Sequence, residues 1–436
     1  MRYYLRGRAG LLCLALILLL ASQLWISISI RWVVGEDEVH NKSSFKDVVN
    51  NDDGLPRNDV NVTILTTGNS SLPVTAAATS YLSTLSSTSL PLCSREQVRH
   101  GQWIPKTYPQ LPYLPKQIPK KQCYTLDTQP RPWHTYEWQP DAARRGDCVF
   151  TEWSANLFCQ EIAALFPLRN STNTNTTHTT TTTIAVMGDS LSMEHFSALI
   201  HSLGVTDFEE ESTFLPNGPQ TFVYQVCPPS QSVKIVFYRT NFLRDRQVVP
   251  FLKEYQPSLL ILNRGAWYTK DEPYLNRIRG VLDVLVEHAA QEYNHKYPPL
   301  HVLWRTTVPG HVTCGRFHHP ATNVTEMEAL VANTSLYSPK ELTFQWQQFQ
   351  HQNQLAEQAF VDVLGTTTNT SRTSNSITWD ILDAYDVNIL RPDEHLVKHN
   401  DCLHSCQPGS KTLVYNTLLL HILRRWRQQV VVERNT

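Results

Sequence analysis

The sequence predicts an α/β protein: a three-layer α/β/α sandwich with a parallel central sheet, plus a smaller disulfide-stapled N-terminal lobe. Short apolar segments at 184–187 and 259–262 alternate with helical apolar spacing such as that at 273–297. Strands without polar alternation are buried on both faces, as parallel strands covered by helices are. Residues 93–165 are instead rich in Pro, Trp and Tyr and hold four cysteines, which favours a small irregular lobe.

The periodic part of the chain runs from residue 184 to the C-terminus. Strands are expected at 184–187, 233–238, 259–262, 302–304 and 377–382, and helices at 191–203, 273–297, 345–364 and 412–426. In open parallel sheets, active groups gather beyond the carboxyl ends of the strands. Polar residues that directly follow a predicted strand are therefore the first candidates for chemistry.

Composition excludes several classes of protein. Across 436 residues, 38 Lys and Arg balance 39 Asp and Glu, which leaves a net charge of −1. A nucleic-acid-binding protein would need a basic excess, so nucleic acid is not an expected partner. Aromatic residues reach 10% and include 11 Trp, which excludes a wholly disordered chain.

The N-terminal segments predict attachment to a membrane. Residues 11–30 carry no charge and are long enough to span a bilayer. Arginines precede this run, so residues 1–10 should be a cytosolic tail and the body should be lumenal. The alternative is a cleaved signal peptide, whose apolar stretch is usually ~7–15 residues. Residues 31–92 read as a disordered stem, and 170–183, with nine Thr in fourteen positions, as a low-complexity loop.

Cysteine and sequon usage agrees with a lumenal body. Eight cysteines lie outside the membrane run, and an even number in an oxidising compartment predicts four disulfides, with 105 possible pairings. These are Cys93, Cys123, Cys148, Cys159, Cys227, Cys314, Cys402 and Cys406. Acceptor sequons for N-glycosylation stand at Asn41, Asn61, Asn69, Asn170, Asn175, Asn323, Asn333 and Asn369.

Two motifs together suggest a nucleophilic serine. Ser190, in Gly188-Asp189-Ser190, is expected at a strand end and a helix start, where the helix N-terminus favours developing negative charge. The bland alternative is an ordinary helix N-cap. Asp401 lies three residues before His404, so its carboxylate can orient one ring nitrogen and leave the other free as a base. A Cys-His-Cys zinc cluster is the rival interpretation, but lumenal cysteines are more often oxidised, so no metal is expected.

A third motif follows the strand at 259–262. The Asn263 side chain could donate a hydrogen bond to an oxyanion beside the Ser190 N–H. The alternative is a turn, since Asn-x-Gly is common turn chemistry. Arg305 ends another strand on the same edge and is expected to contact the acceptor substrate; Trp267 and Asp189 are further candidate substrate contacts.

The order of these motifs resembles the SGNH/GDSL hydrolase superfamily, and the finer match is to the trichome birefringence-like proteins of the PC-esterase group. That match rests on Gly101-Gln102-Trp103, Tyr136-Glu137-Trp138-Gln139-Pro140, Arg305-Thr306 with Pro309 and His311, Arg391-Pro392-Asp393-Glu394-His395, and Asp401-Cys402-x-His404-x-Cys406-x-Pro408-Gly409 followed by Asn416. It covers roughly residues 93–425. The family's Arg-Asn after its Gly-Asp-Ser-Leu is absent here, as is the histidine of its Asn-Thr-Gly-His-Trp.

The resemblance implies a Golgi type II membrane enzyme whose SGNH-like catalytic core spans 184–436. Such enzymes transfer acetyl groups to polysaccharide hydroxyls through a serine acyl-enzyme. They hold no bound cofactor and use an acetyl donor, acetyl-CoA or an acetylated carrier, as co-substrate; a membrane acetyl carrier protein is a candidate partner. The resemblance also brings Cys314 near the Cys402–Cys406 turn, so Cys314 is expected to pair with one of those two, which should not pair with each other.

Two other functions remain open. A carbohydrate esterase would use the same residues, and a non-catalytic glycan-binding membrane protein could retain the scaffold. An acceptor groove is expected from aromatic residues of the N-terminal lobe, although these could instead fill its core. They are Trp103, Trp133, Tyr136 and Trp138.

Overall fold

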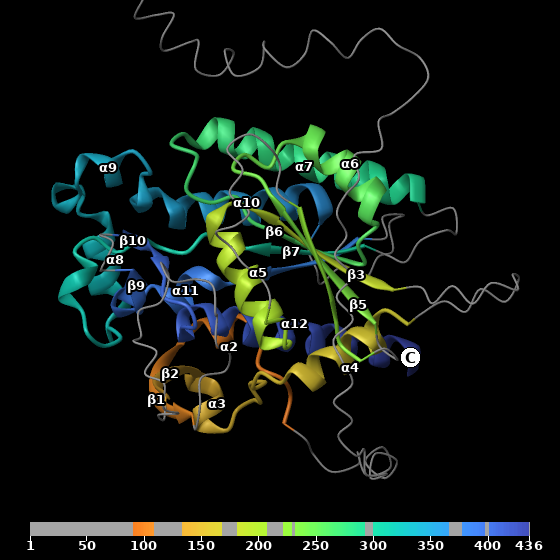
Figure 1. Ribbon diagram of the computed structural model, residues 1–436, viewed down its shortest axis with the longest axis horizontal. Helices are drawn as coiled ribbons and strands as arrows, with labels where there is room; N and C mark the ends of the chain where they lie inside the picture. The colour runs from red at the N-terminus through yellow and green to blue at the C-terminus, as the bar shows by residue number, and fades with distance from the viewer. Residues whose placement is uncertain are drawn as a thin grey trace, which may run out of the picture. The chain divides into compact units, whose positions relative to one another are not determined.

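The structure, a computed structural model, describes residues 90–108, 133–167, 181–206, 221–228, 232–292, 300–365, 377–396 and 401–435. Its centre is a six-stranded sheet with helices on both faces (Figure 1). The strand order is β4-β5-β3-β6-β7-β8; β4 runs antiparallel to β5, and every other pair is parallel. The predicted α/β sandwich is confirmed. The sheet strands are β3 (Thr182–Gly188), β4 (Thr221–Val226), β5 (Val233–Arg239), β6 (Leu259–Leu262), β7 (Leu300–Arg305) and β8 (Ile377–Leu382).

Two groups of helices cover the sheet. The first face carries α6 (Asp245–Tyr255), α7 (Asp271–Glu292) and α10 (Phe349–Leu364), and the second carries α4 (Ala155–Leu165), α5 (Ser190–Ser202) and α12 (Ser410–Asn435). The strands β3 and β6 are buried along their whole length, which explains the apolar runs at 184–187 and 259–262. A fully buried Leu or Ile side chain contributes about 1.5–3 kcal/mol by leaving water, so this core is the main source of stability.

The strands that the sequence predicts correspond to β3, β5, β6, β7 and β8, and the four predicted helices correspond to α5, α7, α10 and α12. Two differences have clear causes. The threonine-rich loop was expected to reach residue 183, but Thr182 and Thr183 are buried residues of β3, where β-branched side chains fit well. The edge strand β4 is mostly half-exposed and shows no clear periodic pattern. The helix α6 does have helical apolar spacing at Val248, Phe251 and Leu252, but it contains Pro250, a residue that disfavours a helix interior.

The N-terminal lobe is a hairpin with short helices. The strands β1 (Gly101–Tyr108) and β2 (Trp133–Pro140) pair antiparallel, between α2 (Arg95–Arg99) and α3 (Asp141–Arg145). Trp103 and Trp138 pack edge to face, and their indole N–H groups donate to main-chain carbonyls. Although they are only 8% and 2% exposed, they line a cavity of about 350 Å³ together with Tyr136, so their expected part in an acceptor groove stays a prediction. Tyr136 is half-buried, and the side chain of Trp133 lies outside the described residues.

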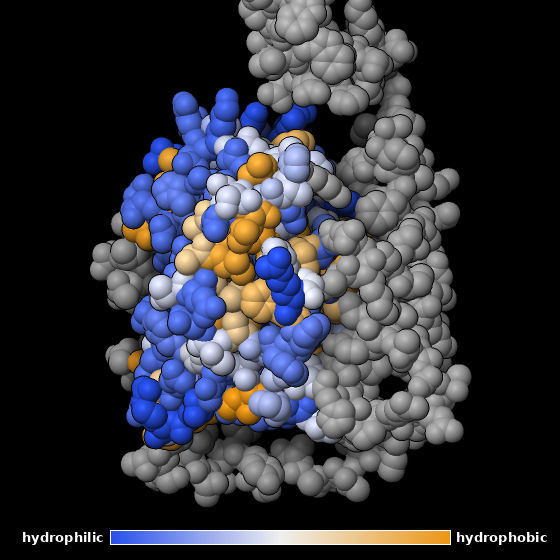
Figure 2. Space-filling model, turned by 90° about the vertical axis from the view of Figure 1, so that its left-hand side faces the viewer, coloured by the Kyte–Doolittle hydropathy of each residue, from blue (hydrophilic) through white to orange (hydrophobic). Residues whose placement is uncertain are grey.

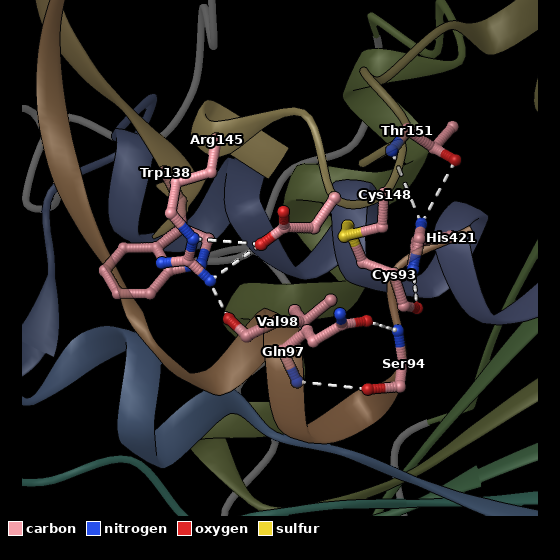
Figure 3. The surroundings of a disulfide bond; sticks show 10 residues. Cys93, Ser94, Gln97, Val98, Trp138, Arg145, Cys148, Thr151 and His421 are labelled. Atoms are coloured by element: carbon pink, nitrogen blue, oxygen red, sulfur yellow. Dashed lines mark hydrogen bonds and ion pairs between the residues drawn. A yellow bond between two sulfur atoms is a disulfide. The ribbon is translucent and has the colours of Figure 1, made fainter. Parts of the chain in front are cut away.

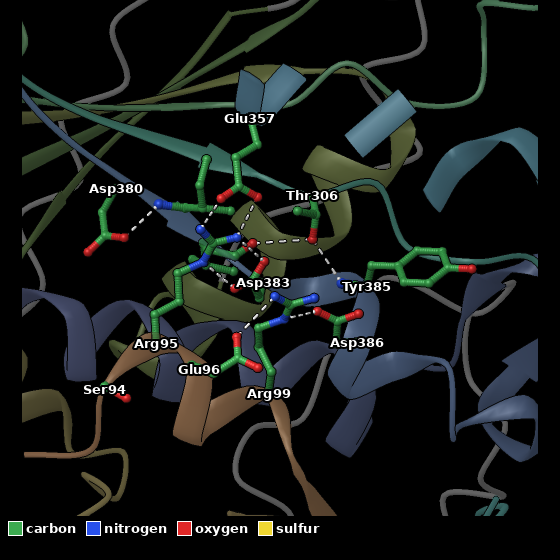
Figure 4. Close-up of polar contacts among 12 residues, drawn as sticks. Ser94, Arg95, Glu96, Arg99, Thr306, Glu357, Asp380, Asp383, Tyr385 and Asp386 are labelled. Atoms are coloured by element: carbon green, nitrogen blue, oxygen red, sulfur yellow. Dashed lines mark hydrogen bonds and ion pairs between the residues drawn. The ribbon is translucent and has the colours of Figure 1, made fainter. Parts of the chain in front are cut away.

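A histidine of α12 and two arginines of α2 attach this lobe, which has its own disulfide, to the sandwich. Cys93 bonds to Cys148, and His421 of α12 contacts the carbonyl of Cys93 at 2.8 Å (Figure 3). Leu92, the last residue of the predicted stem, belongs to this lobe, since it pairs with Val149. Figure 4 shows Arg95 and Arg99 of α2 reaching carboxylates of the sandwich. These are Glu357 of α10, Asp383, and Asp386 of α11 (Ala384–Asn388).

Further short elements surround the carboxyl edge of the sheet. They are α8 (Val324–Ala332), α9 (Pro339–Leu342), β9 (His395–Leu396), β10 (Asp401–Ser405), and the 3-10 turns Cys314–Arg316, Thr334–Leu336, Trp346–Gln348 and Pro392–Glu394. The sequence gives no periodic signal for most of these, because each is only a few residues long.

Disulfides account for seven of the eight predicted cysteines. Besides the lobe disulfide, Cys159 pairs with Cys227 and Cys314 pairs with Cys402, which confirms the expected use of Cys314. Cys406 is also disulfide-bonded, and Cys123 lies outside the described residues. No helix within the described part of the chain is long and apolar enough to cross a membrane. The predicted anchor at 11–30 lies outside that part, as do nearly all of the stem and most of the threonine-rich loop.

Candidate active site

The junction of β3 and α5 sets the position of Ser190. Gly188 ends β3 where a Cβ atom would lie 2.1 Å from the Ser192 hydroxyl oxygen, so only glycine fits. Asp189 is the N-cap of α5, and its carboxylate accepts the Leu191 N–H at 2.9 Å. Ser190 is the first residue of α5, so the helix itself does not bond its N–H. That N–H is therefore available to an oxyanion formed at the serine.

A hydrogen-bonded chain joins Ser190 to the far end of the sequence. His404 of β10 has its Nε2 atom 2.8 Å from the Ser190 hydroxyl oxygen, although 214 residues separate them. Its Nδ1 atom lies 2.7 Å from Asp401 Oδ2. The carboxylate thus fixes a proton on Nδ1 and leaves Nε2 to accept the serine proton. The structure brings all three predicted residues together.

The turn that carries His404 is held from several directions. Asp401 Oδ1 accepts the main-chain N–H groups of Leu403 and His404, at 3.0 and 2.9 Å. Glu194, one turn along α5 from Ser190, accepts the N–H of Ser405 at 3.0 Å. The Cys314–Cys402 disulfide ties the same strand to the loop after β7. Serine and histidine therefore keep their spacing through direct bonds between α5 and β10.

The carboxylate of Asp401 is favoured over its neutral form. Burial raises the pKa of Asp401, but the hydrogen bond and charge of His404 and two main-chain N–H groups outweigh burial and hold that pKa well below its usual value. Asp401 is therefore an anion at neutral pH, as an orienting group for histidine must be.

A cavity of about 170 Å³ opens at these residues. Aromatic side chains form much of its wall, and Trp267 is 42% exposed there. The lining is Ser190, Ala266, Trp267, Ser338, Glu341, Phe344, Trp346, Asp401, Cys402, Leu403 and His404. Figure 2 shows the face formed by α8, α9, β9 and β10, where apolar side chains gather within a hydrophilic rim. Because α9 and β10 supply part of the lining, the cavity belongs to this face.

Asn263 does not have the role expected of it. Its side-chain amide donates to the Arg305 carbonyl at 2.8 Å and to the Thr307 hydroxyl at 3.1 Å, so both amide hydrogens point into the protein. The residue is 1% exposed. The prediction that Asn263 donates to the oxyanion is therefore wrong in this arrangement. The side chain instead joins the ends of β6 and β7 beneath the first turn of α5.

Arg305 and Asp189 also lack the substrate contacts that the sequence led us to expect. Arg305 is fully buried, donates to Asn263 Oδ1 at 2.8 Å and to Ser192 Oγ at 3.2 Å, and cannot contact an acceptor in the cavity. Asp189 is 1% exposed and serves only as the N-cap of α5. Burial raises its pKa, while the charge of Arg305 opposes that shift. Both predicted substrate contacts are wrong; Trp267 alone of the three lines the cavity.

Sequence reasoning missed Glu194, Phe344 and Glu341. Glu194 lies four residues after Ser190, on the same helical face, and this spacing could have indicated its place beside the site. Phe344 and Glu341 come from the irregular region around α9, where no local pattern indicates the cavity. Cys402 is bonded to Cys314, so it offers no thiolate to the zinc cluster considered as a rival. The described residues contain no group of three or more metal-ligating side chains.

Comparison of the sequence with protein-family models gives no match, and comparison with curated proteins gives none either. Conclusions about function therefore come from the site itself.

Proposed function

We propose that the protein is a type II Golgi membrane O-acetyltransferase that transfers acetyl groups to polysaccharide hydroxyls through an acyl-enzyme on Ser190. The observation that carries this proposal is the hydrogen-bonded chain from Ser190 through His404 to Asp401, which opens on a small cavity. The motif order supports it further, because it resembles the acetyltransferases of the PC-esterase group.

In the first step, the Ser190 oxygen attacks the carbonyl carbon of the acetyl donor as His404 Nε2 takes the serine proton. The carbonyl oxygen becomes an oxyanion, which the Ser190 N–H and the α5 N-terminus stabilise. The bond to the leaving group then breaks, and that group takes the proton from His404. The product is an acetyl ester on Ser190.

In the second step, a sugar hydroxyl gives its proton to His404 and attacks the ester carbon. The bond to the Ser190 oxygen breaks, and that oxygen recovers a proton from His404. A cavity of about 170 Å³ suits an acetyl group and part of one sugar ring rather than a long acyl chain. The exposed ring of Trp267 offers an apolar surface to such a sugar. No bound cofactor takes part.

Hydrolysis of the same acyl-enzyme is the second candidate, and one observation favours it. The side chains of His404 and Asp401 are 23% and 32% exposed, so water can approach the site. A water molecule in place of the sugar hydroxyl would make the protein a carbohydrate esterase.

The deciding experiment incubates the full-length, detergent-purified protein with labelled acetyl donor and a panel of polysaccharides. Label on a polysaccharide indicates the transferase, and labelled acetate alone indicates the esterase. Ser190→Ala is the matched control and should abolish both. A wild-type protein that binds glycans, releases no acetate and does not react with a fluorophosphonate would be the non-catalytic binding protein.

A further inference from the structure

Two buried histidines lie directly behind the turn that carries His404. His395, the last residue of the Arg391–His395 motif, is 1% exposed, and His311 is fully buried. His311 Nδ1 lies 2.7 Å from His395 Nε2. Neither ring belongs to the proton path between Ser190 and Asp401.

The outer nitrogen of each ring faces a main-chain carbonyl. His395 Nδ1 lies 3.0 Å from the carbonyl oxygen of His404, and His311 Nε2 lies 2.8 Å from that of Ile389. A carbonyl oxygen only accepts hydrogen bonds, so both outer nitrogens must carry a proton. The contact between the two rings needs a third proton. This arrangement needs one proton more than two neutral imidazoles hold.

The ammonium group of Lys411 faces this pair. The Lys411 ammonium nitrogen of α12 lies 3.2 Å from His395 Nε2. Burial lowers the pKa of His311 to about 3, that of Lys411 to about 8, and that of His395 as well. The charge of Lys411 lowers the pKa of both histidines further. The charges of Glu194 and Glu394 raise the pKa of Lys411, and the charge of Arg391 lowers it further.

The ring contacts require an additional proton, and burial disfavours more than one charge. Both requirements are met when His311, His395 and Lys411 share a single positive charge. The bond from His395 to the His404 carbonyl then persists, because the His395 Nδ1 proton is the one that the geometry requires in every arrangement of that charge. His395 is thus a fixed donor to the main chain of the histidine that works in the site.

We propose that His395, backed by His311, is the positioning residue for His404. Asp401 holds the main-chain N–H of His404 and its ring, and His395 holds its carbonyl, so the residue is restrained at both ends of its backbone. The inference rests on the proposed function of Ser190 and His404. Their geometry depends in addition on the hydrogen bond that the Nδ1 atom of His395 donates to the main chain.

Two substitutions separate a positioning role from a general structural one. In His395→Asn, the side-chain amide nitrogen can occupy the place of Nδ1 and keep donating to the His404 carbonyl. In His395→Gln, the amide nitrogen reaches the place of Nε2 instead, and that donor is lost. His395→Ala is a second deletion variant. Each is made in the full-length protein, and hydrolysis of p-nitrophenyl acetate is measured per active site titrated with a fluorophosphonate.

The expected result is a fall of about 10²-fold in kcat for His395→Gln, with KM unchanged, because a misplaced base costs about that much. His395→Asn should retain most of the wild-type kcat. Equal kcat per titrated site in all variants would overturn the inference. So would Gln and Ala variants that both fail to fold while Asn folds, because the role of His395 would then be stability alone. A wild-type protein whose Ser190 does not react at all would instead overturn the proposed function, and the inference with it.

Discussion

Asp401→Asn is the sharpest test of the candidate triad, because the two carboxylate oxygens have separate tasks. Oδ1 accepts two main-chain N–H groups, and Oδ2 faces His404 Nδ1. An asparagine keeps an oxygen for the main chain and puts an amide nitrogen opposite the imidazole. That nitrogen donates to Nδ1, so the ring proton moves to Nε2, which can then no longer accept the proton of Ser190.

The expected cost is a fall of about 10⁴-fold in kcat, close to 5.5 kcal/mol of transition-state stabilisation, with little change in KM. The assay is hydrolysis of p-nitrophenyl acetate, with circular dichroism to show that the fold is intact. Asp401→Ala is the matched comparison, since it also removes the acceptor that holds the turn and should lower the unfolding temperature. A kcat for Asp401→Asn within tenfold of wild type would refute the role of His404 as an oriented base.

Four further outcomes are expected. Arg305→Ala should destabilise the protein by about 1–3 kcal/mol, since Asn263 and Ser192 lose a buried donor, and should lower glycan acetylation and small-ester hydrolysis in proportion. A selective loss of acetylation would show that Arg305 contacts the acceptor after all. Trp267→Ala should raise KM for a glycan acceptor while leaving small-ester hydrolysis nearly unchanged, measured on one preparation. Replacing Cys314 and Cys402 together by serine should cost about 4–5 kcal/mol in a denaturant titration, because their disulfide spans 88 residues. The native pKa of Asp401 is lowered, so its contribution to stability should be present above about pH 4 and disappear as pH falls through the lower native value; wild type and Asp401→Asn should therefore converge at acid pH.

The parts of the fold that the sequence predicts well are those whose pattern is set by burial. The strand β6 at Leu259–Leu262 matches its predicted bounds because an unbroken apolar run defines a buried strand. The strand β8 at Ile377–Leu382 matches its bounds because apolar residues alternate with Thr378 and Asp380. The residues of the candidate triad could also be predicted, since a serine at a strand-to-helix junction and an Asp-x-x-His turn each suggest one geometry.

The roles of Asn263 and Arg305 could not be predicted in this way. Each follows or ends a strand at the carboxyl edge of the sheet, and a residue there can face the cavity or turn back beneath α5. The choice depends on Thr307 and Ser192, which lie on other elements and accept the polar groups of these two residues. Because the partners come from distant parts of the sequence, strand position alone gives the edge of the sheet but not the direction of the side chain.

This buried network explains why the site can be small yet well ordered. Ser190 stands on a helix whose first turn is bonded to the ends of β6 and β7 through Ser192, while Glu194 on the same helix holds the strand of His404. Arg305, which was expected to contact the substrate, thus supports the first turn of α5, and Glu194, which sequence reasoning missed, fixes Ser190 relative to His404. Under the proposed function, recognition of the acceptor would fall to the exposed wall around Trp267, so variation of that wall should change specificity without changing the geometry of the candidate triad.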